Sequence, residues 1–418
     1  MALTPMPRPV IVVHYHELWL KGRNRNFFLN KLAIALRRAL DGIPLVKIGR
    51  PGDRMMVELG EGARVEEALA RLARVAGISS FAVARTIPRR PEATFDAICQ
   101  AAWQEVEPEQ FATFAVRAKR SDKSFAASSL EIERIVGGHL FDRLRADGRE
   151  VRVRLDNPEL TCRVEITPGP VLVYAKRIPG AGGLPANSGG RMMCLLSGGF
   201  DSAVAAYKMM RRGAHLSFVH FWGGGGLPGE SSVHVARELA RRLVPWQFTA
   251  RLYLVPFEPL QREIVRVAPE NFRVLLYRRL MLRIAERLAI TERGHALVTG
   301  DSLGQVASQT LQNMVAVGDA VRMPVFRPLA GDDKLEILAL ARRIGTHDIS
   351  AEPFHDCCRM FLPKAPALFA SPEELAQAEA TLDIPELVRR GVESAALERF
   401  RYNQGQVEQV ESPHAAHA

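Results

Sequence analysis

MMCLLSGGFDS, residues 192–202, is the stretch of sequence that decides the fold. An apolar run of strand length ends in Ser-Gly-Gly, and the small residues that follow predict the start of a helix. Such a corner forms an anion site, because its N–H groups converge and the helix dipole adds positive potential. Glycine also lets a phosphate approach the backbone closely. We therefore predict a nucleotide-binding loop made of Ser197, Gly198, Gly199, Asp201 and Ser202.

This loop is not the P-loop GxxxxGK[ST], because it is shorter and has no lysine. It resembles instead the SGGxDS loop of the PP-loop ATP pyrophosphatases, enzymes that activate an oxygen with AMP and release pyrophosphate. Asp201 is the natural residue to hold a magnesium ion or to align the nucleotide. The alternative interpretation is an ordinary strand–turn–helix corner of an α/β protein.

The composition is that of a globular protein with two or three domains, since the chain has 418 residues and 47% of them are apolar. No apolar run reaches the roughly 18 residues of a membrane span. Prolines occupy the N-terminus where a signal peptide needs an apolar segment, so we expect a cytoplasmic protein. The five cysteines contain no CxxC pair, which argues against a zinc ribbon, a disulfide framework and an iron–sulfur cluster.

The net charge of +10 is concentrated in the first half of the chain. Residues 1–190 contain 29 Lys and Arg against 21 Asp and Glu, whereas residues 191–418 contain 27 against 25. The positive surplus therefore lies outside the nucleotide loop, as expected of a polyanion-binding module ahead of a catalytic domain. A generally basic, solvated surface is the alternative.

Two small α+β modules are predicted before the nucleotide loop. Residues 1–90 show the β–α–β–β–α–β order of a ferredoxin-like unit, and residues 91–178 form a second module with a serine-capped helix over 129–144. Each module has a basic segment, either solvated or in contact with RNA phosphates. The candidate RNA-binding residues are Lys21, Arg23 and Arg25 in the first module, and Arg117, Lys119, Arg120 and Lys123 in a basic loop of the second.

The Gly- and Pro-rich residues 179–190 are predicted to be a linker. Strands and helices alternate over residues 191–400, which predicts a doubly wound parallel sheet. Ligands of such sheets bind at the carboxyl ends of the strands, where SGGFDS, His220-Phe221 and Gly300-Asp301 fall. The polar residues 401–418 are predicted to form a disordered tail.

Several segments together resemble the tRNA 4-thiouridine synthetase family, ThiI, from Val10 to about Phe400. They are HYHELWLKGRNRNFF, TFAVRAKRSDKSFAASSLEIERIVGGHL, ALVTGDSLGQVASQTLQNM, MPVFRPLAGDDKLEILALARRIGT and EPFHDCCRMFLPKAPAL. The second is similar to the THUMP domain, a tRNA-binding module. Two departures are His16, which replaces a glycine, and the glycine-rich loop after Phe221. The resemblance is to the short form of the family, without a rhodanese domain.

The resemblance implies that ATP adenylates the C4 oxygen of uridine 8 in tRNA, and that persulfide sulfur then displaces AMP. It implies ATP and Mg²⁺ as cofactors, tRNA and a cysteine desulfurase as partners, and a possible homodimer. It assigns catalysis to Asp201, Lys334 and Cys358, with Cys357 as a helper or incidental. The implied ATP contacts are Leu195, Leu196, His220, Phe221, Arg278, Gly300 and Gln309, with Arg279 as an alternative to Arg278.

The remaining thiols are expected to be structural. Cys194 lies within the apolar strand, while Cys99 and Cys162 fall on a predicted helix and strand. Two other functions stay open. One is a PP-loop enzyme that adenylates a different RNA base or a small molecule, and the other is a tRNA-binding protein without catalysis.

Overall fold

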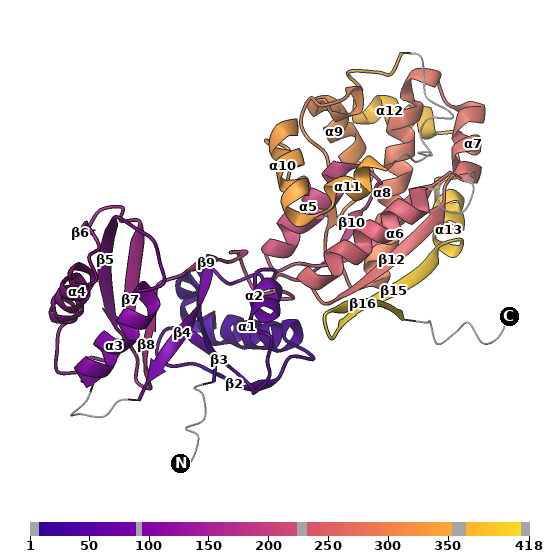
Figure 1. The fold of residues 1–418 in the computed structure, drawn as a ribbon. Coiled ribbons are helices and arrows are strands. Elements are labelled where there is room, and N and C mark those ends of the chain that lie inside the picture. The colour runs from indigo at the N-terminus through magenta and orange to yellow at the C-terminus, as the bar shows by residue number, and fades with distance from the viewer. Residues whose placement is uncertain (1–7, 89–93, 224–231, 353–364, 411–418) are drawn as a thin grey trace. The chain divides into compact units, whose positions relative to one another are not determined.

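The computed structural model describes residues 8–88, 94–223, 232–352 and 365–410, and these form two compact units (Figure 1). The first unit ends at Gly183 and the second begins at Leu184. None of the helices in the described ranges is long and apolar enough to cross a membrane.

The first unit is built on a nine-stranded sheet of order β2-β3-β1-β4-β8-β7-β5-β6, with β9 paired to β4. The strands are β1 (Val10–His14), β2 (Leu45–Gly49), β3 (Met55–Leu59), β4 (Ser80–Ile87), β5 (Thr113–Arg120), β6 (Arg152–Val153), β7 (Leu160–Ile166), β8 (Val171–Tyr174) and β9 (Ile178–Pro179). The helices are η1 (Glu17–Asn24), α1 (Arg25–Ala39), α2 (Val65–Leu72), α3 (Thr94–Val106) and α4 (Ser129–Ala146).

The ferredoxin-like half follows the predicted order, β1-α1-β2-β3-α2-β4. Its central strand β1 lies between β3 and β4, so Ile11, Val12 and Val13 are fully buried. Strand β4 then serves both halves, because its first residues pair with β1 and its last three pair with β8. One continuous sheet therefore joins the two predicted modules.

The THUMP half packs α4 and α3 on the sheet. The buried residues of α4 recur every fourth position, at Ile132, Val136, Leu140 and Leu144, as a helix with one apolar face requires. Its start is set by a capping box in which Ser128 and Glu131 exchange hydrogen bonds, in agreement with the predicted serine cap.

The second unit has a seven-stranded sheet of order β14-β13-β10-β11-β12-β15-β16. Strands β10 to β14 run parallel and β15 and β16 are antiparallel. The strands are β10 (Arg191–Leu195), β11 (His215–Trp222), β12 (Thr249–Pro256), β13 (Leu297–Val298), β14 (Val325–Phe326), β15 (Ala396–Asn403) and β16 (Gln406–Val410). The order reverses at β10, since β11 and β12 lie on one side of it and β13 and β14 on the other.

Helices cover both faces of this sheet, which confirms the predicted doubly wound architecture (Figure 1). One core lies under α5, α6 and α10, and the other under α7, α8, α9, α12 and α13. The helices are α5 (Phe200–Arg211), α6 (Ser232–Leu243), η2 (Val244–Trp246), α7 (Glu258–Val267), η3 (Glu270–Phe272), α8 (Arg273–Thr291), η4 (Ala307–Gln309), α9 (Leu311–Gly318), α10 (Lys334–Ile344), α11 (His347–Ala351), α12 (Pro372–Glu379) and α13 (Ile384–Glu393).

Residues 401–410 do not belong to a disordered tail, so that part of the prediction was wrong. They complete the hairpin of β15 and β16 (Figure 1). Gln404 and Gly405 both have positive φ, as a two-residue hairpin turn requires, and Arg401 pairs with Glu408 across it at 3.1 Å. The segment 179–190 is divided between the two units: Pro179 lies in β9 of the first, and the N–H groups of residues 188 and 189 bond to the carbonyl of Gly213 in the second.

Candidate active site and nucleic-acid interface

The SGGFDS loop joins β10 to the first turn of α5, as the sequence predicts. Ser202 is buried, and its Oγ accepts a hydrogen bond from the Ser197 N–H at 3.0 Å. The Ser197 hydroxyl lies 3.1 Å from the same oxygen and accepts from the Gly199 N–H at 3.3 Å. Ser202 therefore shapes the loop from inside, while Ser197 is the exposed hydroxyl.

Gly300, just after the neighbouring strand β13, supports this loop. A Cβ at Gly300 would lie 2.6 Å from the backbone nitrogen of Ser202 and 2.8 Å from the carbonyl carbon of Asp201. No side chain tolerates such distances, because protein interiors are close-packed. Glycine is therefore required here for β13 to approach the start of α5.

Asp201 is the centre of a polar cluster at the loop. Lys334 Nζ lies 2.6 Å from Asp201 Oδ1, and Gln305 Nε2 donates to Oδ2 at 3.0 Å. Lys334 is the first residue of α10, whose start is fixed by a capping box between Asp333 and Glu336. The side chains of Asp201 and Lys334 are 22% and 44% exposed. Both charges are therefore accessible to a ligand.

A second cluster surrounds the buried carboxylate of Asp301, just after β13. Arg278 from α8 pairs with Asp301, and Arg327 Nε lies 3.3 Å from Asp301 Oδ2. Gln309 Nε2 approaches the same carboxylate at 3.4 Å, and Arg278 Nη1 donates to the Ser308 carbonyl at 2.9 Å. The predicted ATP contacts Arg278 and Gln309 thus meet at one carboxylate. Two arginines around one carboxylate leave positive charge for a phosphate.

The neighbouring Arg279 belongs to the core. Its side chain is 3% exposed, and its Nε donates to Glu379 Oε1 at 2.9 Å. Arg283 donates to the same carboxylate at 2.8 Å, so two arginines of α8 hold α12. Arg279 is therefore not available as an alternative to Arg278.

The side chains of His220 and Phe221, at the end of β11, also serve the core. His220 is buried, with Nδ1 2.8 Å from the Leu196 carbonyl oxygen and Nε2 2.9 Å from Ser232 Oγ. The ring of Phe221 packs edge-on against another buried phenylalanine. Leu196 is buried and Leu195 half-buried. At Leu196, His220 and Phe221 the backbone groups remain for the predicted contacts to adenine, and Leu195 also keeps part of its side chain exposed.

Three of the five cysteines lie in the described residues, and all three are buried. Burial raises the pKa of both Cys162 and Cys194 to about 12 and also raises the pKa of Cys99. Such thiols stay protonated and enclosed, which suits structural roles. Cys357 and Cys358 lie outside the described residues.

The described residues on either side of 353–364 are held by elements at the carboxyl ends of the strands. On one side, α11 places the ring of His347 5.2 Å from that of Phe200, at the start of α5. On the other side, Thr310 Oγ1 donates to the Leu368 carbonyl at 2.7 Å. His347 and Leu368 therefore contact residues next to the Asp201 and Asp301 clusters.

The first basic segment combines cations with exposed aromatic rings. Trp19 and Phe27 are 41% and 49% exposed, and the Arg25 guanidinium lies 3.4 Å from the centre of the Trp19 ring. Lys21 is half-buried, whereas Arg23 is exposed. Aromatic rings interleaved with cations can stack on unpaired bases and contact phosphates.

The second basic segment differs from the predicted loop. Arg117 and Lys119 lie on β5, because parallel pairing with β7 extends this strand to Arg120. Arg120 points back into the protein, where Nη1 donates to two carbonyl groups of the following turn at 2.8 and 2.7 Å. Arg117 donates to the Leu155 carbonyl at 2.6 Å. Lys123 is exposed and belongs to no strand, so of the four it alone lies in a loop as predicted.

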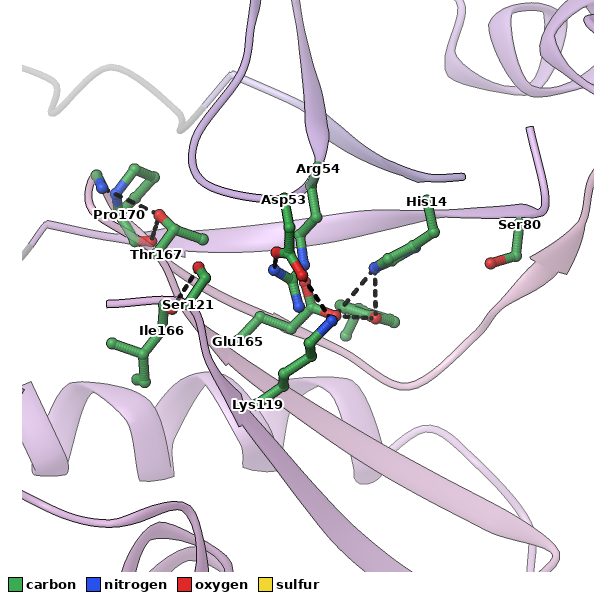
Figure 2. A network of polar contacts seen from close by, with 12 residues as sticks. His14, Asp53, Arg54, Ser80, Lys119, Ser121, Glu165, Ile166, Thr167 and Pro170 are labelled. Atoms are coloured by element: carbon green, nitrogen blue, oxygen red, sulfur yellow. Dashed lines mark hydrogen bonds and ion pairs between the residues drawn. The ribbon is translucent and has the colours of Figure 1, made fainter. Parts of the chain in front are cut away.

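Lys119 belongs to an ionic network that joins the two halves of the first unit (Figure 2). Its Nζ lies 2.6 Å from Asp53 Oδ2, and Asp53 also pairs with Arg54. Arg54, 1% exposed, pairs with Glu165 on β7, whose Oε1 lies 2.9 Å from His14 Nε2 on β1. Lys119 therefore pairs with Asp53 while its side chain stays 63% exposed.

Family models match three successive parts of the chain. They are a ThiI ferredoxin-like domain at residues 10–82, a THUMP domain at 89–176 and a thiamine biosynthesis protein (ThiI) model at 187–384. The probable tRNA sulfurtransferase of Thermus thermophilus is 46% identical over 380 residues, which is 91% of either chain. That of Limosilactobacillus reuteri is 36% identical over 387 residues, 93% of this chain and 94% of the relative. The chain belongs to the ThiI family of tRNA sulfurtransferases.

Solved structures agree with membership in the ThiI family. A 4-thiouridine synthetase solved as an RNA complex with bound ATP is 32% identical, with a TM-score of 0.81, and the match covers 94% of this chain and 99% of that one. A protein from Pyrococcus horikoshii shares the fold, with a TM-score of 0.61 at 23% identity over 81% of this chain and 99% of its own.

The sequence placed Asp301 at a strand end, but it did not identify Asp301, Gln305 or Arg327 as the residues that hold this ThiI site together. Asp301 and Gln305 lie in the segment after β13, and Arg327 follows β14. Polar residues just after parallel strands are a usable signal, because such strand ends share one edge of the sheet. The signal was weak here because β13 and β14 have only two residues each.

Proposed function

We propose that this protein is a tRNA 4-thiouridine synthetase that adenylates uridine 8 of tRNA and replaces the activated oxygen with sulfur. The accessible Asp201–Lys334 pair carries the proposal, because it lies at a phosphate loop where the order of a parallel sheet reverses. The similarity to a 4-thiouridine synthetase solved with RNA and ATP supports the choice of reaction.

The first step attaches AMP to the uridine. The C4 oxygen attacks the α-phosphorus of ATP, and the bond to the β-phosphate breaks to release pyrophosphate. The N–H groups of the SGGFDS loop and the Ser197 hydroxyl receive the phosphates, and Lys334 turns from Asp201 toward them. Arg278 adds positive charge on the β13 side. These groups stabilise the charge that develops on the leaving pyrophosphate.

Magnesium is part of this proposal, and the residues fit it. Mg²⁺ in nucleotide sites is held by one or two carboxylates together with substrate phosphates and water. Asp201 is an accessible carboxylate at the loop. Within the described ranges no three His, Cys, Asp or Glu residues form a metal site, so the phosphates would supply the other ligands. A bound ion would neutralise phosphate charge.

The second step exchanges oxygen for sulfur. The terminal sulfur of a persulfide on Cys358 bonds to C4, and AMP leaves with the former carbonyl oxygen. A further thiol then cleaves the S–S bond, so that the sulfur stays on the base and a disulfide forms. Cys358 is our choice because the buried Cys99, Cys162 and Cys194 are enclosed. Cys357 is a helper or incidental, and a free thiol such as cysteine can supply the second thiol.

The partners follow from this chemistry. A cysteine desulfurase supplies the persulfide sulfur, and the reaction takes place in the cytoplasm. The RNA is bound through the exposed part of the first unit, including Arg23, Lys123 and the rings of Trp19 and Phe27. A homodimer that shares one tRNA is part of the hypothesis, and light scattering with and without tRNA tests it.

Nucleoside mass spectrometry tests the reaction. Unmodified tRNA is incubated with the protein, Mg-ATP, cysteine and a cysteine desulfurase. We expect 4-thiouridine with the wild type and with Cys357→Ser, and none with Cys358→Ser. Equal product from both variants would contradict the role of Cys358.

The two alternatives give different results in the same experiment. Hydrolysis of ATP to AMP without 4-thiouridine would favour a PP-loop enzyme with another substrate. Binding of tRNA without consumption of ATP would favour a non-catalytic tRNA-binding protein.

A further inference from the structure

A second ion pair lies between the same two segments of the second unit as the Asp201–Lys334 pair. Lys208 of α5 pairs with Asp332, which lies two residues before Lys334 at the start of α10. The side chains of Lys208 and Asp332 are 28% and 24% exposed, so both are mostly buried. Neither residue belongs to the SGGFDS loop, and the steps of the proposed reaction give neither of them a role.

The two ion pairs form a reciprocal arrangement of charge. Asp201 and Lys208 are seven positions apart on α5, close to two helical turns, so they lie on one face of the helix. That face presents a negative and then a positive charge, and the segment opposite presents positive Lys334 and negative Asp332. A shift of this segment that exchanged the partners would bring like charges together, which repel each other.

We propose that Lys208 is a positioning residue, which holds Asp332 and thereby fixes the start of α10 so that Lys334 reaches the ATP phosphates. The inference rests on the proposed function, because it concerns the lysine that acts on ATP in the adenylation step. It deepens that function by naming the support on which this lysine depends.

Lys208 holds the segment 327–333, which links β14 to α10, at two points. Its Nζ donates to the Pro328 carbonyl at 3.3 Å and also contacts the Asp332 carboxylate, so one ammonium group bridges four positions of this segment. The Ser302 hydroxyl donates to the Asp332 carbonyl at 3.0 Å and holds the backbone of the same residue. The segment is therefore tied both to α5 and to the chain after β13.

This anchor matters because Lys334 has to change partners during the reaction. The pair at 2.6 Å between Lys334 and Asp201 ties the start of α10 to α5 only until Lys334 turns to the phosphates. The first buried residue of α10 is Ile337, one turn further along, so apolar packing does not hold the first turn. The Lys208–Asp332 pair stays in place throughout. Misplacement of a reacting group by about 1 Å can cost about 10²-fold in rate.

The test is a double-mutant cycle on the adenylation step. The tRNA-dependent exchange of pyrophosphate into ATP is measured for the wild type, Lys208→Met, Lys334→Ala and the variant with both changes. We expect Lys208→Met alone to lower the rate about tenfold, because a poorly placed Lys334 loses part of its effect. In the Lys334→Ala background it should lower the remaining rate no further, since residues that act through one another are not additive.

Two single variants complete the design. Lys208→Arg keeps the positive charge and should retain most of the exchange rate. Arg343→Gln removes an exposed cation from the last turn of α10 and is the control, which should match the wild type.

An equal fall in rate in both backgrounds would overturn the proposal, because Lys208 would then act independently of Lys334. A KM for ATP raised in both backgrounds would identify Lys208 as a direct phosphate contact, and a lowered urea midpoint of unfolding with unchanged KM would identify a structural residue. An unchanged rate in Lys208→Met would show that Lys334 does not need the pair. Any of these results with an active wild type refutes this inference alone, whereas a wild type without exchange refutes the proposed function and this inference with it.

Discussion

Two ionic clusters, one in each unit, show opposite ways of using charge. In the second unit, Asp201 and Lys334 pair at the nucleotide loop with side chains 22% and 44% exposed. In the first unit, Arg54 and Glu165 pair with side chains only 1% and 7% exposed, and His14 completes the contact (Figure 2). The Asp201–Lys334 pair is accessible to a substrate, whereas the Arg54–Glu165 pair is buried within the protein.

The difference in burial decides what each cluster can do. An exposed pair contributes about 0 to 1 kcal/mol to stability, so Lys334 leaves its partner at little cost. Removal of one partner of a buried pair costs about 3 to 5 kcal/mol, because the other charge is left without compensation. We therefore assign chemistry to the Asp201 cluster, and the fixed arrangement of the ferredoxin-like and THUMP halves to the Glu165 network.

The largest expected effect is a loss of activity when the exposed Asp201–Lys334 pair is changed. Asp201→Asn and Lys334→Ala should each lower the rate of 4-thiouridine formation by about 10²- to 10³-fold, because Lys334 would stabilise the phosphate charge and Asp201 would hold the magnesium ion. The unfolding free energy should change by less than about 1 kcal/mol. Asp383→Asn, which keeps the cap of α13, is the matched control and should retain full activity. If these variants lost enough stability to explain their loss of rate, the Asp201 cluster would have a structural role like that of the Glu165 network.

A change in the buried Glu165 network should instead lower the stability of the first unit. Glu165→Gln should destabilise the first unit by about 3 to 5 kcal/mol, because Arg54 and His14 lose their carboxylate. Hydrogen exchange of peptides from β7 and β8 measures this unit separately from the second. Glu150→Gln, at an exposed position, is the control. Unchanged exchange in Glu165→Gln would show that the network does not hold the two halves.

The same network should make the first unit sensitive to acid. Burial by itself raises the pKa of Glu165, but the hydrogen bond from His14 and the charges of His14 and Arg54 lower it to about 2. A carboxylate with a lowered pKa stabilises the fold above its unfolded pKa of about 4.5, and this stability is lost as the pH falls through about 2. Unfolding of the wild type between pH 5 and 2 should show this loss. Glu165→Gln should lack this component.

A smaller effect is expected at Gly300, which packs against the loop that carries Asp201. Gly300→Ala should destabilise the loop by about 1 to 3 kcal/mol and lower ATP affinity, because a Cβ meets the backbone of Asp201 and Ser202. Gly331→Ala meets nothing within 4 Å and is the control. Isothermal titration with a non-hydrolysable ATP analogue measures the difference. Equal affinities would mean that the loop does not depend on this contact.

The smallest effect is expected for single RNA contacts of the first unit. Lys123→Gln should reduce the salt slope of tRNA binding by about 1, because it removes one phosphate contact. Arg120→Gln should instead loosen the turn after β5, since its guanidinium bonds two carbonyl groups there. Filter binding and hydrogen exchange separate the two outcomes. A larger salt effect for Arg120 than for Lys123 would reverse these assignments.

The fold was predictable because its signals are local. The apolar strand and glycine turn of residues 192–202, the alternation that follows and the apolar stripe of α4 each depend on a few adjacent residues. The hairpin of β15 and β16 was missed because its residues are mostly polar, and its pairing depends on the buried Phe400 and a turn at Gln404-Gly405.

The sequence predicted which residues lie at the site, but not the direction in which their side chains point. Asp201 and Lys334 could be named from the sequence, although 133 positions separate them. Whether a side chain faces a ligand or the core depends on packing, which a motif does not contain. Ser202, His220 and Arg120 were therefore expected to contact ligands, and each bonds inside the protein.

Exchange of labelled pyrophosphate into ATP in the presence of tRNA tests whether the SGGFDS loop is the adenylation site. It measures the adenylation step alone, without the sulfur donor. We expect tRNA-dependent exchange in the wild type and in Cys358→Ser, and a loss of about 10²-fold or more in Asp201→Asn. Undiminished exchange in Asp201→Asn, or no exchange in the wild type, would contradict the assignment of the SGGFDS loop as the adenylation site.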